Sequence, residues 1–360
     1  MLRIVHIVPS ISVEASGPSY SVVHLSSALE AIGVDSEVWA IGSNSHIAPG
    51  IRLFKSSLGR FGGKITLKML FVLFRERNNI DILHNNGLWL FSCIFPNMLA
   101  RFIGITVVHA PRGTLAEEAL SISARKKRLV WLLLQRSALS NVKLFHATSH
   151  KEVVEILKFF PAKRIVNIPI GIDVERNLKY KERLNEIIFI GRIHPIKNLE
   201  MVIDSWLSLG SVTSRFTLRI IGPGEEDYRQ ELMSRAVSAT NISIEEALYG
   251  PDKFEALAKA KWSILFSKSE NFGVSIVESL CVATPVITSY GTPWEVIEEN
   301  QAGFWIPLNT CKLASIFETV IDMDQGCYRE YAKNAKDLAV SSFSWENIAL
   351  EMERQYRLVK

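Results

Sequence analysis

The chain has 360 residues, more than one hydrophobic core usually holds, so we expect two domains. Hydrophobic residues make up 48% of it and charged residues 22%, the proportions of a soluble globular protein. A formal net charge of +4 argues against a dedicated nucleic-acid binder. The four scattered cysteines, without a CxxC pair, argue against a disulfide framework or a cysteine metal site, and they favour a reducing compartment.

Short apolar runs alternate with helical patterns in the first half, which predicts parallel α/β architecture. The run at 2–8 reads as a buried strand and not as a signal peptide. No uncharged apolar stretch reaches the ~18 residues that span a bilayer. Apolar residues at helical spacing predict a helix from Val22 to Ile32, which Gly33 closes. Further strands are expected at 36–41, 80–83, 105–109 and 144–147.

The second half repeats this arrangement after a break near 167–173, where a proline and a glycine interrupt the pattern. We expect Asn198 to cap a helix with an apolar face, and residues 343–360 to form one final helix. The apolar face comprises Leu199, Val202, Ile203 and Trp206. The strands of this half are expected at 187–190, 216–221, 262–266 and 285–288.

The unusual loops all follow strands directly, so in a parallel sheet they lie at the same edge, where open α/β sheets bind ligands. The segment SENFGVSIVES at 269–279 carries the strongest signal. A helix that begins near Gly273 and Val274 offers free N–H groups and a positive dipole end to a phosphate. Glu278, one turn further on, could accept hydrogen bonds from ribose hydroxyls, and Glu270 from a sugar.

Cations for such a phosphate follow another strand, in GRIHPIK, where Arg192 offers a planar fork and Lys197 a point charge. Gly222 lies in a third loop, and Gly17 precedes the first helix and could approach the same diphosphate. Each feature also has a purely structural reading. Two glutamates at a fixed spacing are common, and loop cations are usually solvated. Histidines at strand ends, here His84 and His109, are more often structural than catalytic.

Other motifs exclude other functions. The chain has no GxxxxGK loop, which disfavours a P-loop ATPase, and no GxGxxG after the first strand, which weakens a dehydrogenase reading. A formal D-x-D pattern, Asp322 to Asp324, resembles a metal-binding element of some sugar transferases. Because it is expected at the end of a helix, we interpret it as surface.

Taken together, the motifs resemble those of the retaining glycosyltransferases of family 4 (GT4), and the resemblance covers nearly the whole chain. The E-x-F-G-x4-E pattern behind an R-x4-K loop is the most specific part. The matching segments are Gly17-Pro18, DILHNNGLW (81–89), APRGTL (110–115), HATS (146–149), IPIGID (168–173), GRIHPIKN (191–198), IIGPG (220–224), SENFGVSIVES (269–279), ATPVI (283–287) and the final FSW helix.

The resemblance implies the α/β GT-B fold, in which two Rossmann-like domains with parallel sheets face each other. The expected parts are an acceptor-binding domain at 1–170, a donor-binding domain at 171–342 and a helix at 343–360 that returns to the first domain. It implies that Arg192 and Lys197 bind the donor diphosphate, that Glu270 contacts the sugar and that Glu278 contacts the ribose. The expected donor site is Gly17, Arg192, Lys197, Gly222, Glu270, Asn271, Phe272, Gly273, Val274 and Glu278.

The acceptor side departs from the family. Many relatives have His-x-His-Gly-Leu-Trp where this chain has His84-Asn85-Asn86-Gly87-Leu88-Trp89, and Pro-His-Gly where it has Pro111-Arg112-Gly113. The active-site histidine of the family is therefore either His109 or absent. We expect His84 and Arg112 on the acceptor side, and Glu270, Arg192, Lys197 and His109 as the catalytic set.

The expected function is transfer of a sugar from a nucleoside diphosphate sugar, carrying UDP or GDP, to a glycan acceptor with retention and without a metal or other cofactor. The expected acceptor is a glycan on polyprenyl diphosphate in bacterial polysaccharide or O-antigen synthesis. Basic apolar segments at 64–77 and 124–136 suggest contact with anionic lipid, or else ordinary domain helices. The expected location is the cytoplasm, at the inner face of the plasma membrane. The alternatives are a nucleotide-sugar epimerase, a phosphorylase and a non-catalytic sugar-nucleotide-binding protein.

Overall fold

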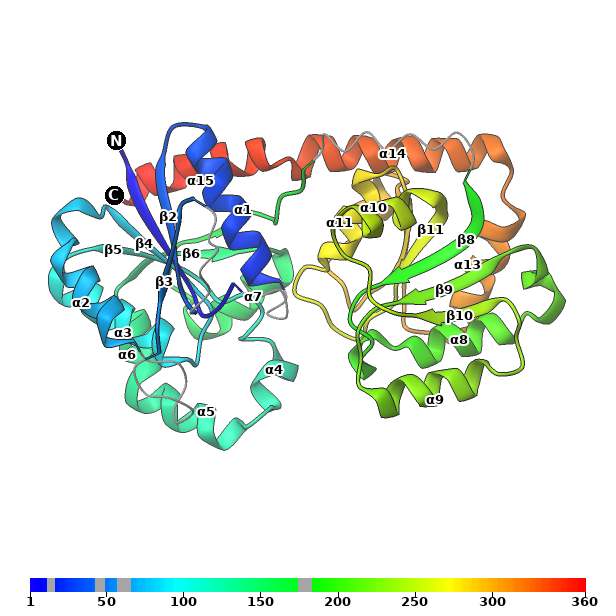
Figure 1. Ribbon diagram of the computed structural model, residues 1–360, viewed down its shortest axis with the longest axis horizontal. Coiled ribbons are helices and arrows are strands. Elements are labelled where there is room, and N and C mark those ends of the chain that lie inside the picture. The colour runs from blue at the N-terminus through cyan, green and yellow to red at the C-terminus, as the bar shows by residue number, and fades with distance from the viewer. Residues whose placement is uncertain (12–16, 43–48, 57–65, 174–182) are drawn as a thin grey trace. The chain divides into compact units, whose positions relative to one another are not determined.

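A computed structural model describes residues 1–11, 17–42, 49–56, 66–173 and 183–360 (Figure 1). The chain forms two compact units. The first comprises Met1–Gly171 and Trp345–Lys360, and the second comprises Ile172–Ser344. The boundaries expected from the sequence, after residues 170 and 342, lie one and two residues from these.

The first unit is built on a seven-stranded parallel sheet with the order β3-β2-β1-β4-β5-β6-β7. Its strands are β1 (Arg3–Val8), β2 (Asp35–Ile41), β3 (Ile51–Phe54), β4 (Ile82–Asn86), β5 (Thr106–Ala110), β6 (Val142–Ala147) and β7 (Ile165–Asn167). Its helices are α1 (Pro18–Ala31), α2 (Leu67–Arg75), α3 (Phe91–Ile103), α4 (Glu117–Ser121), α5 (Ala124–Val130), a π-helical turn η2 (Trp131–Gln135), α6 (Arg136–Ser140), α7 (His150–Phe159) and α15 (Trp345–Val359).

The second unit has a six-stranded parallel sheet with the order β10-β9-β8-β11-β12-β13. Its strands are β8 (Leu184–Ile190), β9 (Thr217–Ile221), β10 (Ile242–Glu245), β11 (Ala260–Leu265), β12 (Val286–Ser289) and β13 (Gly303–Ile306). Its helices are α8 (Leu199–Leu207), α9 (Glu226–Ala236), α10 (Gly250–Lys259), α11 (Val274–Cys281), α12 (Val296–Glu299), α13 (Thr310–Asp322) and α14 (Gln325–Phe343).

The inner strands of both sheets are apolar because helices cover both of their faces. The last five residues of β8, 186–190, are all buried. The nine strands expected from the sequence are confirmed, with shifts of one to three residues at their ends. The helix from the first half is also confirmed, since α1 ends at Ala31 and Gly33 follows with φ 85°.

Two expectations about helix ends are wrong. The helix after Asn198 forms with the expected apolar face buried, but the Asn198 side chain does not cap it. Its backbone is left-handed, with φ 58°, and its amide lies 3.5 Å from the sulfur of Met201. The final helix is not continuous from 343, because α14 ends at Phe343 and α15 begins at Trp345.

The Asp322–Asp324 pattern lies at the surface, as expected. Asp322 ends α13 and forms an ion pair with Arg215, while Asp324 caps α14 and accepts hydrogen bonds from two backbone N–H groups. Among the described residues there is no cluster of three or more histidines, cysteines or carboxylates placed to hold a metal ion. In the same part of the chain, no helix is long and apolar enough to cross a bilayer.

Candidate donor site and acceptor-side residues

The strand order of the second unit places its candidate site. From β8 the chain winds outward in one direction to β9 and β10, and in the other to β11, β12 and β13, so the order reverses between β8 and β11. Such a switch point leaves a crevice at the carboxyl ends of the two strands, where doubly wound sheets bind their ligands. The loops after β8 and β11 are those that carry GRIHPIK and SENFG.

Lys197 and Glu270 meet at this switch point. Their side chains form an ion pair and are only 16% and 15% exposed. The Lys268 N–H donates to the Ile196 carbonyl over 2.8 Å, which joins the two loops. Ser267 Oγ also donates to Glu270 Oε1 over 2.9 Å. The pair is therefore held in place by its own backbone and one hydroxyl.

Gly273 sets the start of α11. Its φ of 85° is a left-handed conformation that favours glycine, and a Cβ there would lie 3.1 Å from Leu265. The Phe272 carbonyl accepts a hydrogen bond from Trp294 Nε1, which holds the residue before this glycine in place. The helix begins at Val274, as the sequence indicated, and its first N–H groups have no acceptor within the helix.

Glu278 is buried one turn into α11, and its partner is one that sequence reasoning missed. Lys253 of α10 forms an ion pair with Glu278 Oε1 at 2.5 Å. The carboxylates of Glu270 and Glu278 are therefore each paired with a lysine from a neighbouring element. No motif marks Lys253 in the sequence, because its pairing depends on how α10 packs against α11.

Gly222 and Arg192 lie in the adjoining loops. A Cβ at Gly222 would come within 1.8 Å of the Gly191 carbonyl oxygen, so the loops after β8 and β9 touch through their backbones. Arg229 Nη1 donates to the Gly222 carbonyl over 2.7 Å and holds this contact. The Arg192 side chain is exposed, and the described part of the chain gives it no ion pair. Asn271 is half-buried beside the glutamate loop.

Histidine clusters inside the first unit. His84 is fully buried, and its Nδ1 lies 2.6 Å from the Tyr356 hydroxyl of α15. His146 lies 3.4 Å from His84 and 2.9 Å from the Ile168 carbonyl. The His6 ring packs 5.0 Å from that of His84, and within the described residues neither of its nitrogens has a hydrogen-bond partner. These residues tie α15 to the sheet, and His84 has no exposed surface.

His109 points to the opposite face of the same sheet. Strand side chains alternate, and His109 pairs with Asn85 in the register of β4 and β5. Its Nδ1 lies 3.2 Å from Asn97 of α3, which also accepts a hydrogen bond from Asn85. The structure therefore does not bring His84 and His109 together, and both side chains are fully buried.

Arg112 holds a strained turn after β5. Its φ is 57°, uncommon for a residue with a side chain, and its guanidinium donates twice to Asn86 Oδ1, over 3.1 and 2.9 Å. Glu152 of α7 accepts from the Gly113 N–H over 2.7 Å and fixes the next residue. Burial lowers the pKa of Arg112, an effect that Glu152 opposes. Gly17, with φ 70°, precedes α1, and the residues just before it lie outside the described ranges.

These histidines should make the protein sensitive to acid. Burial lowers the pKa of His6, His109 and His146 from 6.5 to about 3, and that of His84 well below its ordinary value. Between pH 6.5 and pH 3 the unfolded chain binds protons that the folded chain does not. The free energy of unfolding should therefore fall as the pH falls through this window, by up to ~1.4 kcal/mol per pH unit for each histidine. Urea denaturation at several pH values in this range measures the free energy of unfolding. Its fall with decreasing pH should be less steep for His6→Phe than for the wild type. Equal pH dependence in the two proteins would contradict a lowered pKa at His6.

Comparisons with known proteins agree with this arrangement. A family model described as "Glycosyl transferases group 1" matches residues 173–338, and one described as "Glycosyltransferase Family 4" matches residues 15–176. An uncharacterised glycosyltransferase of Methanocaldococcus jannaschii is 26% identical over 193 residues, which are 52% of this chain and 48% of the relative. The lipopolysaccharide 1,2-N-acetylglucosaminetransferase of Salmonella typhimurium is 21% identical over 198 residues, 51% of each.

The chain spans about half the length of these curated relatives. The fold is shared over a longer range. The crystal structure of HepE from Anabaena, in complex with UDP and glucose, aligns with a TM-score of 0.77 over 99% of this chain and 100% of that one, at 16% identity. The two family matches together run from residue 15 to residue 338. With the shared architecture they show that the chain belongs to the group 1, family 4 glycosyltransferases and has the GT-B fold.

Proposed function

We propose that the protein transfers a sugar from a nucleoside diphosphate sugar to an acceptor hydroxyl and retains the configuration of the anomeric carbon. The observation that carries this proposal is the Lys197–Glu270 pair at the switch point of the second unit. A cation and a carboxylate held together beside a glycine-led helix start suit a ligand with a diphosphate joined to hydroxyl-bearing groups. The alignment with a UDP-bound structure of the same fold supports the choice of ligand class.

The chemistry follows from where charge develops. As the bond to the anomeric carbon breaks, negative charge builds on the leaving diphosphate. Lys197, Arg192 and the N–H groups at the start of α11 would stabilise that charge, and such preorganised donors are worth ~2.7–4 kcal/mol each. Glu270 would orient the sugar through its hydroxyls, and Glu278 would hold the ribose. No metal is needed in this scheme, because the cations take over its electrostatic role.

No carboxylate of the site is placed in this scheme as a covalent nucleophile. We therefore propose attack on the same face as the leaving group, with a phosphate oxygen accepting the proton of the acceptor hydroxyl. His109 is left out of the catalytic set because its side chain is buried between sheet and helix. Arg112 is retained on the acceptor side, because it is half-buried and directly follows β5.

The direct test is a panel of UDP- and GDP-sugars offered with a polyprenyl-diphosphate-linked glycan, with the product configuration read by NMR. We expect one donor class to give product with the anomeric configuration of the donor. An inverted product would contradict the mechanism. Turnover of nucleotide sugar without acceptor would indicate an epimerase, and tight binding without any turnover would indicate a binding protein. The same assay with a metal chelator tests the metal requirement, and we expect activity to be undiminished.

We further propose that the acceptor is lipid-linked, in bacterial surface polysaccharide or O-antigen synthesis, and that the first unit contacts the cytoplasmic face of an anionic membrane. Its α2 is apolar on both sides: Met69, Val72 and Leu73 are buried, yet Phe71 is 63% exposed. Leu132 and Leu133 of η2 are 65% and 67% exposed. The same two stretches of sequence carry exposed basic residues, namely Lys68, Arg75, Arg125, Lys126, Arg128 and Arg136.

Vesicle binding tests this contact. The protein should sediment with vesicles that contain phosphatidylglycerol and much less with pure phosphatidylcholine, because apolar insertion and charge attraction act together. The double variant Leu132→Ser/Leu133→Ser should lose most of this binding. Leu358→Ser, at another exposed leucine of the same unit, is the matched control and should bind as the wild type does. Equal sedimentation of all three proteins would contradict the membrane contact.

A further inference from the structure

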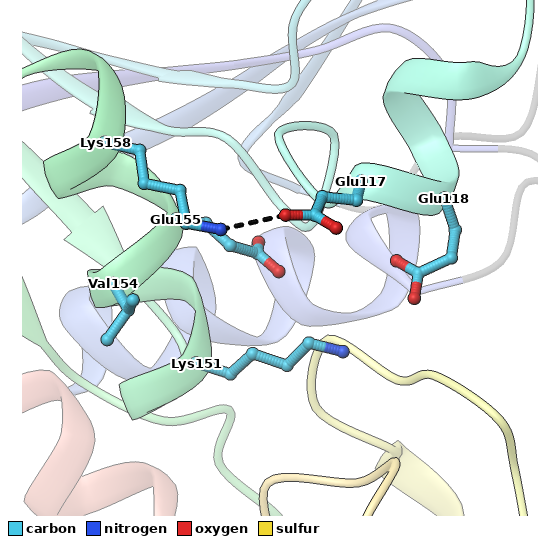
Figure 2. Close-up of a pocket in the computed structure, with 6 residues that line it drawn as sticks. All are labelled: Glu117, Glu118, Lys151, Val154, Glu155 and Lys158. Atoms are coloured by element: carbon cyan, nitrogen blue, oxygen red, sulfur yellow. Dashed lines mark hydrogen bonds and ion pairs between the residues drawn. The ribbon is translucent and has the colours of Figure 1, made fainter.

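A groove of about 360 Å³ lies between α4 and α7 in the first unit (Figure 2). The side chains of α7 extend toward those of α4, and one ion pair, Lys158 with Glu117 at 3.0 Å, crosses it. Its volume is at the small end of the range for ligand pockets. The lining residues are Glu117, Glu118, Lys151, Val154, Glu155 and Lys158.

Glu155 is the unusual member of this lining. It is only 8% exposed and yet lines the groove. Within the described chain its carboxyl accepts no hydrogen bond and forms no ion pair. Burial raises its pKa to about 7, and Glu152 and Glu118 add to this while Lys151 and Lys158 oppose it. A carboxyl that has lost water without gaining a donor is costly. A ligand that brings hydrogen-bond donors into the groove would remove this cost.

The lining chemistry narrows the class of ligand. Carboxylates only accept hydrogen bonds and ammonium groups only donate them, whereas a hydroxyl does both. Three carboxylates against two lysines make the groove unfavourable for phosphates. One valine is too little apolar surface for a hydrophobic ligand, but it suits the C–H face of a sugar ring. A neutral, polyhydroxylated ligand matches all three observations.

The groove also adjoins the acceptor-side turn. Glu152 lies one helical turn before Glu155 on α7 and holds the Gly113 N–H, next to Arg112. The chain then runs from this turn directly into α4, which carries Glu117 and Glu118. The Arg112–Gly113 turn is thus joined to one wall of the groove by a hydrogen bond and to the other by the chain itself.

We propose that the groove between α4 and α7 binds a neutral sugar unit of the acceptor glycan, with Glu155 accepting hydrogen bonds from its hydroxyls. The identification of this sugar as part of the acceptor rests on the proposed function, whereas the binding of a sugar in the groove does not. Lys151 and Lys158 donate to other hydroxyls, and Val154 packs against the ring. The residues act as a specificity subsite and take no part in bond breaking.

Saturation-transfer NMR without any nucleotide sugar tests the site. The probes are the methyl glycosides of glucose, galactose, mannose and N-acetylglucosamine at millimolar concentration. We expect signal from at least one, weakened about tenfold in affinity by Glu155→Leu, since the hydrogen bonds to the Glu155 carboxyl are lost. Glu155→Leu should fold, because it removes a desolvated carboxyl, and a thermal melt checks this. Glu30→Gln, at an exposed glutamate of α1, is the matched control and should bind as the wild type does.

The outcomes separate the two proposals. Lys197→Ala should keep the glycoside signal while losing transfer, so a failed donor assay with retained glycoside binding would sink only the proposed function. No signal from any of the four glycosides, or signals unchanged in a folded Glu155→Leu, would overturn the groove assignment. Stronger competition by glucosamine or putrescine than by every neutral glycoside would overturn it as well, since the groove would then select cations.

Discussion

Replacement of Lys197 by alanine should lower the rate constant for sugar transfer by about 10²–10³-fold, the loss expected when one preorganised donor to a developing negative charge is removed. The charge appears on the diphosphate only as the bond breaks, so kcat should fall more than the donor KM rises. The variant also removes the ion-pair partner of Glu270, while the hydrogen bond from Ser267 Oγ to Glu270 Oε1 can remain. Steady-state kinetics on the donor that the panel identifies measures both constants.

The matched control is Lys268→Ala. Lys268 lies in the same loop, two residues before Glu270, but its side chain is exposed and only its backbone N–H joins the loops. We expect its kinetic constants to stay within about twofold of the wild type, because alanine keeps the backbone N–H that joins the loops. If Lys197→Ala kept full kcat, or if both lysine variants lost activity equally, Lys197 would not be the cation that stabilises the leaving group.

Gly222→Ala should be the most destabilising of the conservative changes near the site. Its Cβ would lie 1.8 Å from the Gly191 carbonyl oxygen, and backbone cannot move aside as the end of a side chain can. Overpacking of this kind costs up to about 3 kcal/mol, which urea denaturation followed by circular dichroism can measure. Because the loop that carries Lys197 begins at Gly191, the folded variant should also bind the donor more weakly.

Gly210→Ala is the control for this glycine. A Cβ at Gly210 meets no atom within 4 Å, so only its positive φ of 51° is penalised, at about 1 kcal/mol. Gly222 also has a positive φ, of 158°, so both variants carry a conformational penalty and the difference of about 2 kcal/mol is assigned to the backbone contact. Equal destabilisation by both changes would show that the loops after β8 and β9 do not touch as the structure has them.

The fold and the donor loops could be predicted because both leave local marks in the sequence. Buried parallel strands read as apolar runs, and ligand loops follow strands directly. The start of α11 at Val274 was predicted from a glycine before an apolar run. The edge strands β3, β7 and β10 were missed because they are short and half-exposed, and β13 because its four residues do not stand out from the loops around them.

The partners of the site residues could not be predicted, because they depend on packing. Lys253 reaches Glu278 only when α10 lies against α11. Tyr356 reaches His84 across 272 residues of sequence, once α15 joins the first unit. The sequence likewise gives no sign that His84 and His109 occupy opposite faces of one sheet, since that follows from the register of β4 with β5.

The central claim is that a pyrophosphoryl group lies against the start of α11 within reach of Lys197. A crystal structure of the protein with UDP, or with GDP if the panel favours it, tests this most directly. We predict phosphate oxygens within hydrogen-bonding distance of the Val274 N–H and of Lys197 Nζ, with Glu278 at the ribose hydroxyls. A nucleotide bound elsewhere, or one whose phosphates face solvent while Lys197 stays paired with Glu270, would contradict the account.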